Sequence, residues 1–303
     1  MTIIPPRFKE CYAPLVADPE AFFASLLTPA PKAFRVNTLK TTTEHVKKRF
    51  ALYGIGIHTV PWSPDVCIAD NPSIGSTLEH ALGHIYLQEL TSMIPPLLVA
   101  PELAHAQFVL DACAAPGSKT TQLAALMQNR GTIVANDIDS NRVRALQFNL
   151  EKSGVCNTVV THQDLRTVTG YAFDAIILDV PCSLEGTIRK DPIVLSHWSE
   201  QTIAQHAHLQ KQLIVHAFDL LAENGTLVYS TCTFAPEENE AVVSELLTRR
   251  PAHLVPIALP GLVMRPGVTS WNGKTFDQRV AETRRIFPHD NNTGGFFVAQ
   301  VKK

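Results

Sequence analysis

The stretch FVLDACAAPGSKT, residues 108–120, decides the fold that we expect for this chain. It begins with a short apolar run that suits a buried parallel strand, and small residues then lead into Pro116-Gly117. From Ser118 onward the apolar residues recur at helical spacing. A strand that turns sharply into a helix leaves unpaired backbone N–H groups where an anionic group of a ligand can bind. The stretch therefore predicts a cofactor loop, although it matches neither the dinucleotide motif nor the phosphate-binding P-loop.

Strands and helices alternate from this stretch to the end of the chain. The predicted strands cover residues 108–110, 132–138, 157–162, 173–180, 225–233 and 295–301. The predicted helices begin at residues 118, 141, 199 and 236, and the second and third end at Gly154 and Ala222. This alternation is typical of an α/β fold with a doubly wound, mainly parallel sheet, which binds ligands outside the carboxyl ends of its strands. We assign this domain to residues 105–303.

The first 104 residues predict a smaller α+β domain. Strands are expected at residues 34–39 and 57–62. Between them, Thr41 and Glu44 have the spacing of a capping box at the start of a helix. Residues 85–99 have helical spacing that two prolines interrupt, and we interpret them as the link between the domains.

Basic residues are unevenly distributed along this smaller domain. Residues 29–60 contain six basic residues and one acidic residue, whereas residues 61–105 contain five acidic residues and no Lys or Arg. The basic run is either a solvated face or a surface that contacts nucleic acid. The net charge of −2 argues neither for nor against a nucleic-acid partner, because local charge decides that.

Composition excludes several classes of protein. With 303 residues, of which 45% are apolar and 18% charged, the chain can bury a substantial core. It has no apolar run of about 18 residues and no signal pattern, so we expect a soluble, cytoplasmic protein without a membrane partner. Its six cysteines lack metal-ligand spacing, and His80 and His84 have no third ligand in view, so we expect neither disulfides nor a metal site. We also expect a monomer.

Acidic residues and thiols lie at the ends of the predicted strands. Asp137 ends the second strand, where an acid can accept hydrogen bonds from ribose hydroxyls, and Asp164 follows the third. Either residue could instead be a turn or cap residue. Asp179 and Cys182 lie at the end of the fourth strand, and Cys232 lies at the end of the fifth. Because these strands are neighbours in a doubly wound sheet, we expect both thiols and a carboxylate in one crevice beside the cofactor loop.

The residues DACAAPGSKT closely resemble the S-adenosylmethionine loop of the Sun/Nop family (RsmB/Nop/Sun type) of RNA 5-methylcytosine methyltransferases. The resemblance runs from about residue 33 to residue 301 and includes FRVNTLK, Y-x-Q-E, RKDP, PEENE and GFF. It implies a Rossmann-like class I methyltransferase core with S-adenosyl-L-methionine as cofactor, and an N-terminal domain that contacts RNA. It assigns the cofactor to Cys113, Ala114, Ala115, Pro116, Gly117, Lys119, Asp137, Arg142, Asp164 and Asp179.

The same resemblance assigns the catalytic roles. Carbon 5 of cytosine is a poor nucleophile until a thiolate adds to carbon 6, which a carboxyl group at N3 assists. The family's TC motif supplies that thiolate, here Cys232, and its PC motif supplies the helper in product release, here Cys182, with Asp179 at the base. DNA cytosine methyltransferases use the PC cysteine as nucleophile, so the sequence YSTCT favours RNA. One departure is Leu184, which stands where PCSG is usual and could alter how the target base is seated.

Two groups of basic residues are expected to contact RNA, namely Lys47, Lys48 and Arg49, and Arg189 and Lys190. The alternative for both groups is exposed charge on a solvated surface. We favour tRNA over rRNA as the substrate, because the chain leaves no room after Lys303 for an added RNA-binding domain.

Two other functions compete with this reading. Amino-group methyltransferases that act on DNA or protein place N/D-P-P-Y after the fourth strand, where this chain has Val-Pro-Cys. A catalytically silent RNA-binding scaffold in ribosome assembly would keep the fold without the chemistry, and the intact thiols and carboxylate argue against it.

Overall fold

Strand β5 (Phe108–Asp111) and helix α6 (Ser118–Leu126) form a strand-turn-helix unit in the computed structural model, which describes residues 3–303. The turn between them ends at Gly117, whose φ of 104° lies in the left-handed region. A Cβ at this position would also lie 3.0 Å from the Cδ1 atom of Leu146. Glycine therefore allows both the conformation of the loop and its close approach to Leu146 of the helix that covers it, α7 (Ser140–Ser153).

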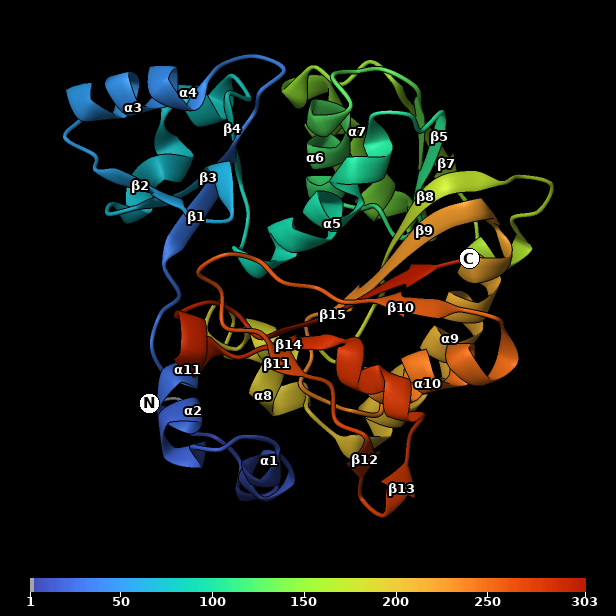
Figure 1. Ribbon diagram of the computed structural model, residues 1–303. Helices are drawn as coiled ribbons and strands as arrows, with labels where there is room; N and C mark the ends of the chain where they lie inside the picture. The colour runs from blue at the N-terminus through green and yellow to red at the C-terminus, as the bar shows by residue number, and fades with distance from the viewer. Residues whose placement is uncertain (1–2) are drawn as a thin grey trace.

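The remaining strands of the large sheet are β6 (Thr132–Asp137), β7 (Thr158–His162), β8 (Phe173–Asp179), β9 (Leu221–Thr231), β10 (His253–Val255), β11 (Arg265–Pro266), β14 (Arg284–Ile286) and β15 (Phe296–Lys302). Their order is β11-β14-β15-β9-β8-β5-β6-β7, with β10 paired to β15 (Figure 1). The strands from β7 to β9 are parallel, whereas β15 runs antiparallel to β9. The prediction of a doubly wound, mainly parallel sheet is confirmed.

Helices cover both faces of this sheet. α5 (Ile94–Leu103), α6 and α7 (Ser140–Ser153) share cores with one face, and α9 (Glu200–Asp219) and α10 (Glu240–Arg249) share a core with the other. Successive side chains of β8 alternate between these cores, so that Ile177 packs toward α5 and Ile176 toward α9. The interior of the strand, residues 175–178, is apolar because both of its faces are covered.

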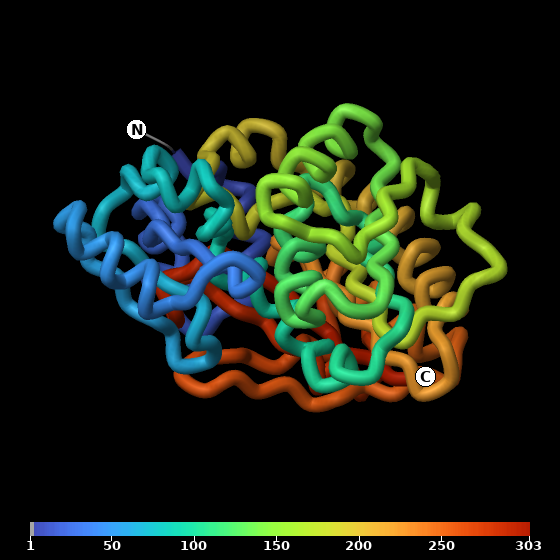
Figure 2. Tube along the Cα trace, turned by 90° about the horizontal axis from the view of Figure 1, so that it is seen from above, coloured from blue at the N-terminus to red at the C-terminus, as the bar shows by residue number. Residues whose placement is uncertain are grey.

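A second, antiparallel sheet forms the smaller domain. It has the order β2-β3-β1-β4 and consists of β1 (Lys32–Val36), β2 (Ile57–Val60), β3 (Ser63–Ala69) and β4 (Ile85–Leu87). α3 (Thr43–Leu52) packs on it through Val46 and Phe50, and the short α4 (Leu78–Ala81) precedes β4. This domain lies beside α7 (Figure 2), where the Asn37 side chain donates to the Ser153 carbonyl at 2.8 Å.

Two local predictions in the smaller domain are wrong. Residues 85–99 do not form one interrupted helix, because Ile85–Leu87 pairs with β1 and the helix begins only at Ile94. The two prolines then lie in the first turn of α5, where a missing N–H leaves no helical bond unmade. The cap of α3 is the Thr42 hydroxyl, so the capping box predicted at Thr41 is one residue out of register.

The first two helices pack on the larger domain and away from the small sheet (Figure 1). α1 (Pro6–Tyr12) and α2 (Pro19–Leu26) share a core with α8 (Val194–His197), Phe234 and Phe287. The hydroxyl of Tyr12 donates to the buried carboxylate of Glu185 at 2.6 Å. Residues 6–26 are therefore in the same core as residues that come after position 105.

The turn before α10 also differs from its prediction. The sequence predicts a helix from Pro236, but α10 begins at Glu240. Asn239 has φ −105° and ψ −98°, which lies outside the helical region. The turn buries the side chains of Glu238 and Asn239 completely.

The rest of the chain adds small elements at the edges of the large sheet. α9 ends at Asp219 rather than at the predicted Ala222, because Leu221 already pairs with Phe173 in the sheet. A hairpin of β12 (Ser270–Trp271) and β13 (Lys274–Thr275) and the helix α11 (Pro288–Asn291) precede β15.

Within residues 3–303, no helix combines the length and apolar character needed to cross a bilayer, and no three His, Cys, Asp or Glu side chains gather as metal ligands.

Candidate active site

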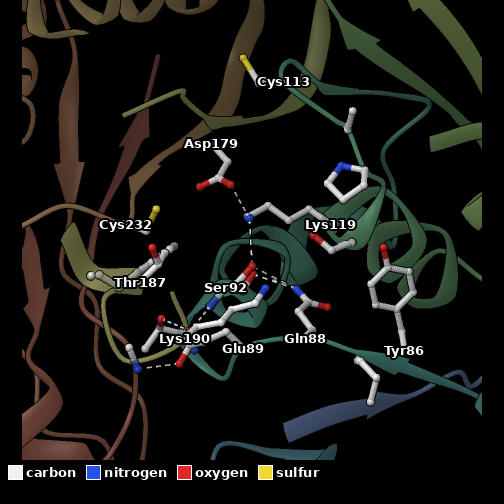
Figure 3. A pocket seen from close by; sticks show the side chains of 18 of the residues that line it. Tyr86, Gln88, Glu89, Ser92, Cys113, Lys119, Asp179, Thr187, Lys190 and Cys232 are labelled. Atoms are coloured by element: carbon white, nitrogen blue, oxygen red, sulfur yellow. Dashed lines mark hydrogen bonds and ion pairs between the residues drawn. The ribbon is translucent and has the colours of Figure 1, made fainter. Parts of the chain in front are cut away.

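A cavity of about 370 Å³ lies at the carboxyl ends of β5, β8 and β9 (Figure 3). The loop after β5 lines it on one side, and β4 with the segment that follows lines it on another. The polar side chains in its wall include Tyr86, Gln88, Glu89, Ser92, Cys113, Lys119, Asp179, Thr187, Lys190 and Cys232. This is the position at which a doubly wound sheet binds its ligands.

A second cavity of about 110 Å³ adjoins the first, since Cys113 and Arg142 line both. Asp137 and Asp164 lie in its wall, together with apolar side chains of α9. An elongated ligand can therefore extend from the second cavity into the first.

Lys119 and Asp179 form an ion pair in the wall of the larger cavity (Figure 3). Nζ of Lys119 lies 2.5 Å from Oδ2 of Asp179 and donates to the Ser92 hydroxyl at 3.2 Å. Oδ1 of Asp179 accepts from the Ser230 hydroxyl at 2.6 Å. Donors from α6 and β9 thus orient both oxygens of this carboxylate, which gives it a fixed position in the cavity.

The two predicted thiols meet at the ends of neighbouring strands. The Sγ atoms of Cys182 and Cys232 are 3.4 Å apart. The pairing of Asp179 with Ser230 in β8 and β9 sets this proximity, because each thiol follows a few residues later. Cys182 is buried and Cys232 is half-buried in the cavity wall. The hydrogen bond with Cys232, followed by burial, raises the pKa of Cys182 well above its usual value, so Cys182 is a neutral thiol at neutral pH.

Asp137 holds the loop after β5 and also lines the second cavity. Its Oδ2 atom accepts from the Ala115 N–H at 3.1 Å, and its Oδ1 atom accepts from the Asp139 N–H at 3.0 Å. The Arg142 guanidinium lies 3.5 Å from the same carboxylate and donates to the Ala115 carbonyl. Asp137 therefore makes the turn contacts that the sequence left as one alternative, and it also lines the second cavity.

Asp164 is oriented by its own neighbour in the chain. Its carboxylate accepts from the backbone N–H and the guanidinium of Arg166, the latter at 2.6 Å. The Arg166 guanidinium also lowers the pKa of Asp164, which keeps that carboxylate ionised. Asp164 thus lines the second cavity as an ionised carboxylate paired with Arg166.

Arg189 is not the exposed cation that we expected. It is 9% exposed, and its guanidinium donates to the carbonyls of Thr28, Pro29 and Thr293 and to the side chain of Asn292 at 2.7–2.9 Å. Its charge therefore anchors the chain before β1 to the chain before β15. Lys190, by contrast, is exposed at the mouth of the cavity.

The basic run on α3 is partly neutralised by nearby acids. Arg49 donates to the buried Glu79 at 2.8 Å, and Lys47 pairs with Glu44 at 3.0 Å. Lys48 is exposed. We therefore expect less charge at this surface than the sequence alone suggests.

The backbone conformation at Leu184 is one that favours glycine, the residue usual at this position in the family. Its φ of 64° lies in the left-handed region, which a leucine adopts at a cost of about 1–2 kcal/mol. Its side chain is 47% exposed and points away from the core. The departure thus keeps the backbone turn after Cys182, at the expense of local strain.

Residues of the smaller domain complete the cavity, and sequence reasoning did not assign them. Glu89 accepts from the N–H groups of Thr91 and Ser92 at 2.7 and 3.2 Å through one oxygen and from the Gly294 N–H at 2.8 Å through the other. It thereby ties the segment after β4 to the chain before β15. The Y-x-Q-E segment is the signal in the sequence for these residues, but it predicts only that they lie near the junction of the two domains.

Comparison with known families identifies the chain. A model of the family "16S rRNA methyltransferase RsmB/F" matches residues 98–302. The chain belongs to this family. A model of the N-terminal domain of 16S rRNA methyltransferase RsmF matches residues 4–90 of this RsmB/F chain. The predicted family is confirmed.

Relatives in the RsmB/F family differ in the RNA that their names give. Ribosomal RNA small subunit methyltransferase F of Cronobacter sakazakii is 41% identical over 293 residues, 93% of this chain and 59% of that protein. The tRNA (cytosine(49)-C(5))-methyltransferase of Pyrococcus abyssi is 39% identical over 295 residues, 94% of this chain and 92% of that protein. This chain spans about three fifths of the length of the bacterial RsmF relatives.

Solved structures share the whole fold. A methyltransferase homolog from Pyrococcus horikoshii is 33% identical, with a TM-score of 0.84 and 99% of each chain covered. NSun6 from Pyrococcus horikoshii, solved with SFG, is 23% identical, with a TM-score of 0.84 and coverage of 99% of this chain and 98% of that one, and it shares the fold. The likeness to the Pyrococcus horikoshii methyltransferase homolog thus covers both the class I methyltransferase sheet and the small N-terminal antiparallel sheet of this RsmB/F family member.

Proposed function

We propose that this protein is an RNA (cytosine-5-)-methyltransferase that uses S-adenosylmethionine and forms a covalent bond between Cys232 and its target base. The observation that carries the proposal is the 3.4 Å separation of the Cys182 and Cys232 sulfurs, beside a cavity lined by Cys232, Asp179 and the loop after β5. Two thiols and a carboxylate are the groups that methylation of cytosine at carbon 5 requires.

The two adjoining cavities fit the two ends of S-adenosylmethionine. The second cavity, with apolar walls and the carboxylates of Asp137 and Asp164, suits an adenosine. In the first cavity, Asp111 has a buried Oδ1 atom without a hydrogen-bond partner, which suits the ammonium group of the methionine end. When bound, this cofactor supplies an electrophilic methyl group.

Cys232 and Asp179 then act on the base. The Cys232 thiolate adds to carbon 6, which makes carbon 5 nucleophilic toward the methyl group. Asp179 shares a proton at N3 of the ring, and the Lys119 and Ser230 donors hold its carboxylate in place for that contact. Before the addition, the neutral Cys182 thiol donates to the Cys232 thiolate and so stabilises it.

Cys182 acts after methyl transfer. Its sulfur lies 3.4 Å from that of Cys232, which places it beside the carbon 6 that Cys232 attacks and the adjoining carbon 5. Cys182 first gives its own proton to solvent and, as a thiolate, takes the proton from carbon 5. Removal of that proton breaks the bond from Cys232 to carbon 6, which releases the methylated base and the free thiolate.

The substrate that we propose is tRNA, with rRNA as the second candidate. Similarity to the Pyrococcus abyssi tRNA enzyme covers 92% of that protein, which supports tRNA. The match of residues 4–90 to the N-terminal domain of RsmF supports rRNA. Lys190 at the cavity mouth and the basic surface of α3 would contact the phosphates, which gives affinity without sequence choice.

Methyl transfer to RNA tests this proposal. Purified protein with radiolabelled S-adenosylmethionine and total RNA from cells that lack the gene should label one RNA class, and bisulfite sequencing should locate the cytosine. RNA binding without any transferred label would instead support a catalytically silent scaffold. Label found only on DNA or protein would support amino-group methylation.

A further inference from the structure

Two adjacent buried residues, Glu238 and Asn239, lie behind the thiols in the turn before α10. Both are fully buried, and neither is among the residues that line the two cavities. A carboxylate and an amide in such a position require hydrogen-bond partners, because an unpaired buried polar group is costly. The loops that carry the two cysteines provide those partners.

Glu238 holds the loop of Cys182 on both sides of the thiol. Its carboxylate accepts from the N–H of Ser183 at 3.1 Å and from the Ser183 hydroxyl. It also accepts at 2.8 Å from Gln210, whose amide donates at 2.8 Å to the Pro181 carbonyl. Residues 181 and 183 are thus tied to one carboxylate, directly or through one side chain.

Asn239 holds the loop of Cys232 in the same way. Its Oδ1 atom accepts from the Thr231 hydroxyl at 2.5 Å, and its Nδ2 atom donates to the Thr233 carbonyl at 3.0 Å. These two threonines are the immediate neighbours of Cys232 in the chain. One amide therefore brackets the thiol, and it makes no contact with the Cys182 loop among the hydrogen bonds of residues 3–303.

We propose that Glu238 and Asn239 are positioning residues with separate tasks, Glu238 for the release thiol Cys182 and Asn239 for the nucleophile Cys232. The inference rests on the proposed function, because it assigns each residue to one half of the covalent cycle. A shift of about 1 Å in a reacting group can cost about 100-fold in rate, so a residue that never touches the base still controls its step.

The test compares turnover with the protein–RNA adduct that survives denaturing electrophoresis. Glu238→Gln should accumulate adduct and lower turnover about 100-fold, as a poorly placed Cys182 slows release. In a Cys182→Ala background, Glu238→Gln should change neither turnover nor the amount of adduct further, because Glu238 acts only through the position of that thiol. Asn239→Ala should have the opposite effect on the adduct. Introduced into the Cys182→Ala protein, it should reduce the amount of adduct at least 10-fold, since a displaced Cys232 adds slowly to carbon 6 of the base.

Controls separate positioning from folding. Glu237→Gln changes the neighbouring carboxylate, which faces Trp271 and Asn272 instead of the thiols, and it should behave like the unmodified protein. All variants should bind S-adenosylmethionine with unchanged affinity in calorimetry. If Asn239→Ala loses that binding, Asn239→Asp takes its place, since it keeps the acceptor for Thr231.

The outcomes distinguish the inference from the proposed function. If Cys182→Ala alone gives no adduct, the covalent mechanism is wrong and the inference falls with it. If Cys182→Ala gives adduct but Glu238→Gln and Asn239→Ala change the adduct in the same direction, the inference alone is overturned. Opposite directions, with cofactor affinity intact, would establish it.

Discussion

The ion pair between Arg285 and Glu240 lies entirely inside the protein and should be costly to break. The two side chains are 3% and 0% exposed. Nε of Arg285 lies 2.6 Å from Oε1 of Glu240, and a second nitrogen contacts Oε2. The guanidinium also donates to the Phe234 carbonyl at 2.8 Å, and Oε1 accepts from the Val268 N–H at 3.0 Å. Every charged atom of the pair thus has a partner.

Arg285→Met removes one partner and leaves a buried, uncompensated carboxylate. Breaking such a pair costs about 3–5 kcal/mol of unfolding free energy. At about 2 °C per kcal/mol for a large domain, the melting temperature should fall by roughly 6–10 °C. The double variant Arg285→Met/Glu240→Leu removes both charges and should recover most of that loss, because apolar residues of similar volume often replace a buried pair without penalty.

Urea unfolding followed by circular dichroism measures these differences. Arg250→Met is the matched control, because Arg250 forms its ion pair with Asp219 at 2.6 Å with side chains 32% and 44% exposed. Exposed pairs contribute about 0–1 kcal/mol, so this variant should be nearly neutral. If Arg285→Met costs no more than Arg250→Met, or if the double variant is less stable than either single change, the reasoning from burial is refuted.

Four further predictions concern the site and its surroundings. Cys232→Ala should be inactive without any RNA adduct, whereas Cys182→Ala should accumulate an adduct; the reverse pattern would exchange the two roles. Asp137→Ala should weaken S-adenosylmethionine binding by roughly 1.5–3 kcal/mol, and unchanged affinity by calorimetry in a folded variant would remove it from the site. Burial raises the pKa of Glu238 to about 7. The stability contributed by the protonated side chain is therefore fully present below about pH 4.3, the pKa in the unfolded chain, and is lost as pH rises through 7. Glu238→Gln should therefore flatten that decline between about pH 4.3 and pH 7 in urea unfolding, and identical slopes would contradict the assignment. Neutralising residues 47–49 together should weaken RNA binding and flatten its salt dependence without changing cofactor affinity, and an unaltered salt slope would mark the run as a solvated face.

The fold was predictable from sequence because its central strands are covered on both faces. The interior of a strand such as β8 must then be a continuous apolar run, here residues 175–178, and this run is recognisable without knowledge of its neighbours. The sequence also predicted the proximity of Asp179, Cys182 and Cys232. The topology of a doubly wound sheet makes the carboxyl ends of β8 and β9 adjacent, and these residues lie at those ends.

Predictions failed where long-range contacts override a local pattern. Arg189 sits in a run of charged residues that suggests an exposed surface, yet residues more than 100 positions away in the chain bury it. Glu238 follows a proline and another glutamate, which favours the first turn of a helix. Its partners Ser183 and Gln210 belong to other elements, so nothing in the local sequence indicates that the carboxylate turns inward.

The docking of α1 and α2 has a consequence for synthesis on the ribosome. Tyr12 is made 173 residues before its partner Glu185, an interval of roughly 9–35 s at typical elongation rates of about 5–20 residues per second. Phe8 and Phe22 are both fully buried in the finished protein. The ring of Trp198 that packs on Phe8, and the rings of Phe234 and Phe287 that pack on Phe22, are made much later. The nascent chain therefore carries two helices with uncovered aromatic residues while the segments that bury them are still being made, and a chaperone that shields these helices would act during that interval.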